Sequence, residues 1–184
     1  MWKRVKCRPR GRCGLVWIVA AIVAWWVQGA VPVVSAAEHV GWVPSQEELI
    51  KRFLGALRSR DAAALRGLRV TESEYCEVIL PGSVPPGERL RAWPEEVTRY
   101  FWGQLNGKSL YSEQQLLQVY GGNPYVLKAT EFTEGEQEYA TYKAYKKLRL
   151  RLQVEGEPDR EAVLDTGSIA EIGGRFKFIS FVRD

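Results

Sequence analysis

The sequence predicts an α+β fold in which N-terminal helices pack on a curved antiparallel sheet. Three observations lead to this prediction. Apolar residues recur at helical spacing between Ser45 and Tyr120, they alternate at strand spacing from Tyr125 onward, and the pair Gly173-Gly174 joins two β-rich runs near the end of the chain. Helices followed by a run of strands are typical of α+β domains, because strands that are apolar on one face need a cover for that face.

The first 37 residues are predicted to be a signal peptide. Residues 1–12 carry six basic side chains and no acid, Leu15 to Val27 is an unbroken apolar run, and small residues follow as far as Ala37. We expect cleavage after Ala36 or Ala37, export to the periplasm or the exterior, and one domain over residues 38–184. The alternative is an uncleaved membrane anchor, which would place the domain at a membrane. For that role the apolar run is short, since a span needs about 20 apolar residues.

The basic character of the chain comes from this leader. The whole sequence has 26 basic and 22 acidic residues, and without the six basic residues of the leader the balance is 20 against 22. No nucleic-acid partner is therefore expected. Cys76 is the one cysteine after the leader, so no internal disulfide can form. We expect it to be a small buried side chain; the alternative is a reactive thiol.

Local signals divide the first half of the domain into helices. Ser45, Asp61 and Thr71 each precede an apolar-periodic run and are predicted to cap a helix, the first of which reaches about Arg60. Ser45 and Thr71 are each followed three residues later by a glutamate, as in a capping box. Pro81 is predicted to end the third helix, because proline has no backbone N–H to continue it.

A longer helix is predicted next, with Pro94 as its first residue. Asn106-Gly107 is expected to interrupt this helix, Ser112 to restart it, and Gly121-Gly122 to stop it.

The second half of the domain is predicted to be strands. Tyr125 to Phe132 is one candidate, and Tyr139 to Val154 is a long one with a bulge or bend near Lys146. Leucines alternate in this second run with the basic residues Lys147, Arg149 and Arg151. We expect the basic residues to form a solvated face neutralised by acidic neighbours, although they could instead bind an anion.

Two segments resemble the NTF2-like (SnoaL-like) superfamily. They are Phe53 to Leu68, with Arg60-Asp61-Ala62-Ala63-Ala64-Leu65 inside it, and the closing run from Gly167 through Gly173-Gly174 to Phe178. The resemblance covers residues 44–184 and implies a curved sheet wrapped round helices to form a cone with a pocket. Members of the superfamily include isomerases, dehydratases and non-catalytic binding domains. No catalytic set of the superfamily matches residues of this chain.

A binding pocket is predicted from Trp102, Tyr142 and Asp165. Aromatic residues crowd the middle of the chain, and most of them are expected in the core. An apolar pocket with a few polar groups is the usual composition of a ligand site. Its expected occupant is a small apolar ligand or a protein partner.

Several catalytic chemistries are disfavoured. The one histidine, His39, lies beside the expected cleavage point, so sites based on histidine lack their base or ligand, and neither a metal nor a cofactor is predicted. Val163 to Ser168 matches the fingerprint of an aspartic protease, but only 16 residues follow it, too few for the flap and second strand of that fold. The leading hypothesis is a non-catalytic binding or interaction domain. The alternative is a small-molecule enzyme that uses Asp165 and a tyrosine for acid–base chemistry.

Overall fold

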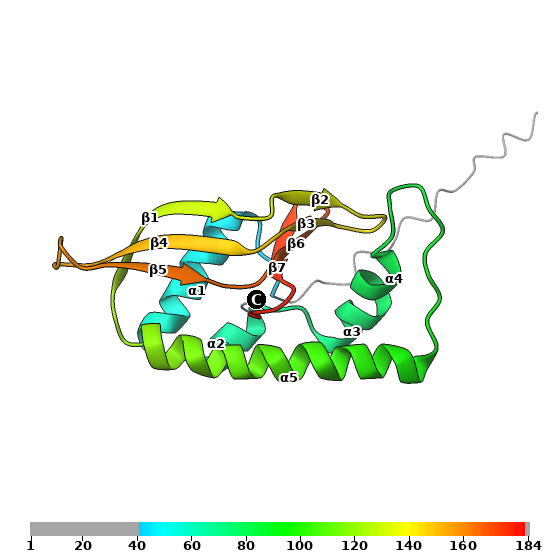
Figure 1. The fold of residues 1–184 in the computed structure, drawn as a ribbon, viewed down its shortest axis with the longest axis horizontal. Coiled ribbons are helices and arrows are strands. Elements are labelled where there is room, and N and C mark those ends of the chain that lie inside the picture. The colour runs from blue at the N-terminus through cyan, green and yellow to red at the C-terminus, as the bar shows by residue number, and fades with distance from the viewer. Residues whose placement is uncertain (1–40, 183–184) are drawn as a thin grey trace, which may run out of the picture. The chain divides into compact units, whose positions relative to one another are not determined.

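The computed structural model describes residues 41–182, which lie in one compact unit spanning residues 38–184. The predicted signal peptide and cleavage site, together with His39, fall outside the described residues. Helices come first and antiparallel strands follow, so the predicted α+β class is confirmed. The strands form two sheets (Figure 1).

The three predicted N-caps are confirmed. The helices that they begin are α1 (Gln46–Ser59), α2 (Ala62–Gly67) and α3 (Glu72–Glu74). Each cap side chain accepts a hydrogen bond from the backbone N–H three residues ahead, which satisfies a donor that the helix itself leaves free. The box at Thr71 is reciprocal, whereas the box predicted at Ser45 is not, because the Glu48 carboxylate accepts from Arg52 Nε at 2.7 Å.

Pro81 does not end the third helix at its own position, and that prediction is wrong. The chain continues from α3 through a π-helical segment, η1 (Tyr75–Ile79), into the short α4 (Leu80–Gly82). In the π-helical turn the N–H of Leu80 donates to Tyr75, five residues back. Pro81 then lies in α4, one residue before the helix ends at Gly82.

Helix α5 (Glu95–Tyr120) is continuous over 26 residues. The predicted interruption at Asn106-Gly107 is therefore wrong, and Pro94 is the N-cap instead of the first helical residue. Asn106 looks like a breaker in the sequence but faces the interior, where its Oδ1 accepts a hydrogen bond from Arg69. The helix ends before Gly121, as predicted.

The three-stranded sheet has the order β1-β4-β5, and the four-stranded sheet has the order β2-β3-β6-β7. Their bounds are β1 (Tyr125–Phe132), β2 (Glu136–Glu138), β3 (Lys143–Tyr145), β4 (Leu148–Val154), β5 (Glu161–Asp165), β6 (Ile169–Ile172) and β7 (Arg175–Phe178). All pairs within the sheets are antiparallel, and the turn at Gly173-Gly174 joins β6 to β7 as predicted.

The long strand predicted over Tyr139–Val154 is two strands, β3 and β4. The bend expected near Lys146 is confirmed, because Lys147 has a φ of 52°, which breaks the extended conformation. Residues 139–142 form a turn that connects β2 to β3, closed by a bond from Tyr139 N–H to the Tyr142 carbonyl.

The main core lies between α1, α5 and the inner face of the three-stranded sheet. The alternating residues of β4 from Leu148 to Val154 are buried on this face, as the sequence predicts. Phe53 of α1 packs against Phe178 and Phe181, with ring centroids 5.1 and 5.8 Å away. In Figure 1, α5 runs alongside both groups of strands, so it can border a cavity and help to close the core.

Candidate functional site

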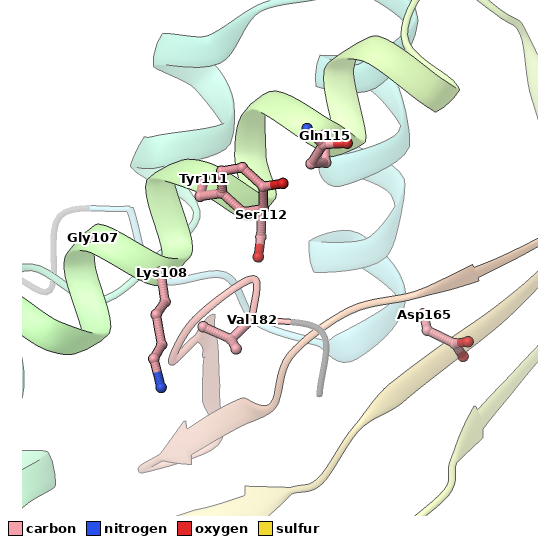
Figure 2. A pocket seen from close by; sticks show the side chains of 7 residues that line it. All are labelled: Gly107, Lys108, Tyr111, Ser112, Gln115, Asp165 and Val182. Carbon is pink, nitrogen blue, oxygen red and sulfur yellow. The ribbon is translucent and has the colours of Figure 1, made fainter.

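A cavity of about 820 Å³ opens between α5 and the segment that follows β7. Figure 2 shows the side chains around it. The lining residues are Gly107, Lys108, Tyr111, Ser112, Gln115, Asp165 and Val182.

One stripe of α5 forms a wall of this cavity. Lys108, Tyr111, Ser112 and Gln115 stand at positions i, i+3, i+4 and i+7, a spacing that places side chains on the same face of a helix. The stripe exists because α5 is continuous through Asn106-Gly107. These residues were not among the predicted site residues, although their helical spacing in the sequence was a signal for them.

Two of the polar groups on this stripe have no protein partner. The Lys108 side chain is exposed and makes no ion pair or hydrogen bond with any residue between 41 and 182. Ser112 is 8% exposed, and its hydroxyl makes no hydrogen bond within the same range. The Ser112 hydroxyl still reaches solvent in the cavity although most of the residue is buried, so both groups are accessible to a ligand.

Asp165 borders the cavity, but its carboxylate is engaged elsewhere. On the β4–β5 ladder Arg149 lies opposite Asp165, and the buried Leu150 lies opposite Leu164. The carboxylate therefore faces away from the core and accepts from Arg149 Nε at 2.7 Å. This pairing raises the pKa of Arg149, through the hydrogen bond first and then the charge of Asp165. Figure 2 shows the Asp165 side chain turned away from α5.

Trp102 and Tyr142 lie in a different part of the domain, both near Tyr75. The Trp102 ring contacts the Tyr75 ring with centroids 5.6 Å apart. Tyr142 belongs to a second buried cluster against which Tyr75 packs, and its hydroxyl lies 2.9 Å from Ser83 Oγ. Burial, with a smaller opposing effect of the Ser83 bond, raises the pKa of Tyr142 to about 12. Neither ring lines the cavity at Asp165, so a pocket formed by all three residues stays a prediction.

Interior charges fix α5 on the rest of the domain. Arg66 donates to the buried carboxylate of Glu113 through Nε and Nη2, at 2.9 to 3.1 Å. Arg69 is 7% exposed, with its Nη2 bonded to Asn106 and its Nε and Nη1 without a partner among the described residues. Burial lowers the pKa of Arg69. The inward face of α5 is thus polar at its centre, and arginines from outside the helix satisfy it.

A second interior ion pair lies beneath β7. Lys177 is 1% exposed and donates to both oxygens of Glu74 at 3.0 Å. Trp42 Nε1 donates to the same carboxylate at 2.6 Å, and its ring lies 5.6 Å from the Lys177 ammonium. Burial acts to raise the pKa of Glu74, but the hydrogen bonds from the Thr71 backbone, Trp42 and Lys177 outweigh it, so the pKa is lowered. The pair connects α3, in the first half of the domain, to β7, its last strand.

The basic residues beside the leucines are partly neutralised, as predicted. Arg149 pairs with Asp165 and Lys147 pairs with Glu134.

Cys76 is half-buried instead of fully buried. Burial, with the charges of Glu72 and Glu77, raises its pKa, which disfavours the reactive thiolate.

Within residues 41–182 no group of three or more metal-ligating side chains occurs. No helix in that part of the chain is both long enough and apolar enough to cross a membrane.

Comparison with protein-family models finds no match, and comparisons with curated proteins and with solved structures find none either.

Proposed function

We propose that the chain is an exported, non-catalytic binding domain and that the cavity beside α5 is its binding site. The observation that carries the proposal is a cavity of about 820 Å³ that presents two polar groups, Lys108 and Ser112, without partners among the residues that the structure describes. Small-molecule sites are concave spaces of roughly 300–1,000 Å³ with a few placed polar groups. This cavity fits that description in size, and its lining is more polar than that of most such sites.

An NTF2-like cone is part of the proposal. Backbone hydrogen bonds cross the bend between the two sheets: Thr166 N–H donates to the Leu148 carbonyl at 2.8 Å, and Leu148 N–H to Gly167 at 3.2 Å. On the neighbouring strand, Thr133 N–H donates to Lys147 at 3.0 Å. These bonds support the interpretation of residues 125–178 as one meander of long, bent strands. A meander bent in this way, with helices against it, would have the curvature that the family resemblance implies.

Binding is favoured over catalysis by the state of Asp165. An acid–base enzyme needs a carboxylate directed at the substrate and removed from competing charges. The Asp165 side chain is 41% exposed and bonded to Arg149. Tyr142, the tyrosine of the predicted pocket, has its hydroxyl beside Ser83 and does not line this cavity. Tyr111 lines the cavity together with Asp165, but the carboxylate is bonded to Arg149, so this arrangement favours binding over acid–base chemistry.

Export rests on the predicted leader, and retention of the leader as an anchor is the alternative. N-terminal sequencing of the protein recovered from an expressing host separates the two. A start at Ala37 or Glu38 supports cleavage, whereas recovery of the intact N-terminus in the membrane fraction supports the anchor.

The binding site can be tested with a matched pair of tryptophan substitutions. A helical side chain covers the turn that precedes it, so Gln115→Trp directs an indole over Tyr111 and Ser112 and fills the cavity. Gln114→Trp adds the same group one residue away, at an exposed position outside the cavity lining.

Binding of a fragment set is followed through the backbone amide NMR signals of residues 108–115. We expect binding to wild type and to Gln114→Trp, and loss of binding in Gln115→Trp. Equal binding by both variants, or fragments that shift only other residues, would contradict the proposed site.

A further inference from the structure

Resting on the proposed function, we infer that the ligand of this cavity is a carboxylate with a short apolar tail. The inference concerns the same cavity and names the chemistry that its lining recognises. It follows from the charge of the lining, from the state of Ser112 and from the apolar surface beside them.

The lining carries one uncompensated positive charge. Lys108 and Asp165 are the charged residues of the cavity, and the negative charge of Asp165 is already matched by Arg149 at 2.7 Å. The ammonium of Lys108 is left without an acidic partner between residues 41 and 182. One unmatched ammonium suits a monoanion. A polyanion such as a nucleic acid would need a track of basic residues, which this lining does not provide.

Ser112 supplies a second donor beside the ammonium. Three hydroxyls in helices or at their ends donate to the carbonyl four residues back: Ser59 to Gly55 at 3.1 Å, Ser83 to Ile79 at 2.6 Å, and Thr98 to Pro94 at 3.1 Å, whereas Ser73 bonds to the Glu77 side chain. Ser112 makes no such bond, although it lies in the same kind of helix and is 8% exposed. Its hydroxyl reaches the solvent of the cavity, and no residue between 41 and 182 accepts from it.

Lys108 and Ser112 are placed to act on one group. They are four residues apart on α5, so their Cβ atoms are about 5–6 Å from one another on one face of the helix. A carboxylate has two oxygens and accepts from an ammonium with one and from a hydroxyl with the other. Figure 2 shows both side chains extending from α5 toward the side on which Val182 lies.

Apolar surface beside the donors favours a tail on the ligand. The Tyr111 ring lies one turn from Lys108 and is 66% exposed, and Val182 stands on the opposite wall. An exposed ring of this size in a cavity wall gains from contact with an aliphatic chain, because that contact removes apolar area from water.

Three compounds with one tail and different heads test the inference: hexanoate, hexanamide and hexylamine, titrated at pH 7.5 and followed by the amide NMR signals of residues 108–115. Hexanoate is expected to bind about tenfold more tightly than hexanamide, a difference of about 1.4 kcal/mol. Hexylamine is expected to bind most weakly, because its charge repels Lys108.

Substitution of Lys108 separates the effect of its charge on binding from the effect of its apolar chain. Lys108→Met keeps a side chain of similar length without the ammonium, and Lys128→Met makes the same change at an exposed position on β1, away from the cavity. Lys108→Met is expected to weaken hexanoate binding about tenfold and to leave hexanamide binding unchanged. Lys128→Met is expected to change neither.

The outcomes distinguish the inference from the proposed function. If hexanoate and hexanamide bind equally well, and Lys108→Met affects neither, the carboxylate inference is overturned while the cavity remains a binding site. If none of the three compounds shifts residues 108–115 at millimolar concentration, the inference is also overturned. The proposed function falls with it when the fragment set fails to bind there as well.

Discussion

Replacing Gly107 with alanine tests the feature on which the candidate site depends, the continuity of α5. In the sequence, Asn106-Gly107 predicts a break, whereas the structure has both residues inside a helix of 26 residues. The two possibilities give opposite signs for the change in stability. A glycine in a helix interior destabilises the helix relative to alanine, whereas a glycine with a positive φ at a break is strained by any replacement.

The magnitude follows from the surroundings of Gly107. A Cβ placed there meets no atom within 4 Å, and the residue is not among the glycines with a positive φ. No steric cost therefore offsets the difference in helix propensity, which is roughly 0.8–1.0 kcal/mol in favour of alanine. For a domain of this size that gain raises the melting temperature by about 3–5 °C.

Two other glycines provide controls. Gly103 lies in α5 with open space around it, and Gly103→Ala should give the same gain. Gly167→Ala should be destabilising, because its Cβ would lie 2.2 Å from the Ser180 carbonyl oxygen. Urea unfolding of the three variants, followed by circular dichroism, gives the free energies. A loss of stability in Gly107→Ala beside a gain in Gly103→Ala would refute the continuous helix and, with it, the stripe that lines the cavity.

Three further predictions concern the interior charges. Lys177→Met leaves the partly buried Glu74 without its cation and is expected to cost about 3 kcal/mol in urea unfolding; a loss below 1 kcal/mol would mean that the pair is not desolvated. The pKa of Glu74 is lowered in the folded state. The ionised carboxylate therefore contributes fully to the stability of the fold above its ordinary pKa of 4.5, and this contribution is lost as the pH falls through the folded pKa. Unfolding midpoints measured from pH 7 to pH 3 should therefore fall less below about pH 4.5 in Glu74→Gln than in wild type, and parallel curves would contradict this assignment. Arg66→Met removes the partner of Glu113, whose side chain is 2% exposed, and should lower the free energy of unfolding more than Arg69→Met, which removes a guanidinium with two nitrogens that have no partner among the described residues. Equal losses in these two variants would show that Arg69 has acceptors in solution.

The features predicted correctly from the sequence are those that neighbouring residues decide. The caps at Ser45, Asp61 and Thr71 depend on a side chain and an amide three residues apart. The inward leucines of β4 depend on a period of two, and the last hairpin depends on its glycine pair. In each of these cases the interaction that sets the structure lies within a few residues of the signal.

The features that were missed depend on residues far apart in the chain. Asparagine has a low helix propensity, which favours a break at Asn106. Here the residue stays in the helix and faces inward, where Arg69, 37 residues earlier, donates a hydrogen bond to it. The strand break at Lys146-Lys147 was expected only as a bend, because the hydrogen bonds that divide the strands between two sheets come from other parts of the chain. Local patterns carry no information about such partners.

The candidate site shows the same limit. Asp165 was predicted to line a pocket, but it ends β5 with its side chain on the face opposite the core, because Leu164, its neighbour, is the buried residue. The alternation of side chains between the two faces of Glu161–Asp165 already indicates which face Asp165 occupies. By contrast, the stripe from Lys108 to Gln115 becomes visible only after the helix is known to run through Gly107.

The position of the cavity follows from how α5 is held. Its inward face is polar at the centre, so hydrogen bonds to fixed donors set its place more than apolar contact does. One of these bonds runs from the Phe181 N–H to Ser109 Oγ at 2.8 Å, and Phe181 itself is fully buried. The next residue, Val182, forms the wall opposite the Lys108 stripe. The bond to Ser109 thus sets the distance between the two walls. A ligand that contacts both walls would stabilise the arrangement in which this bond is formed.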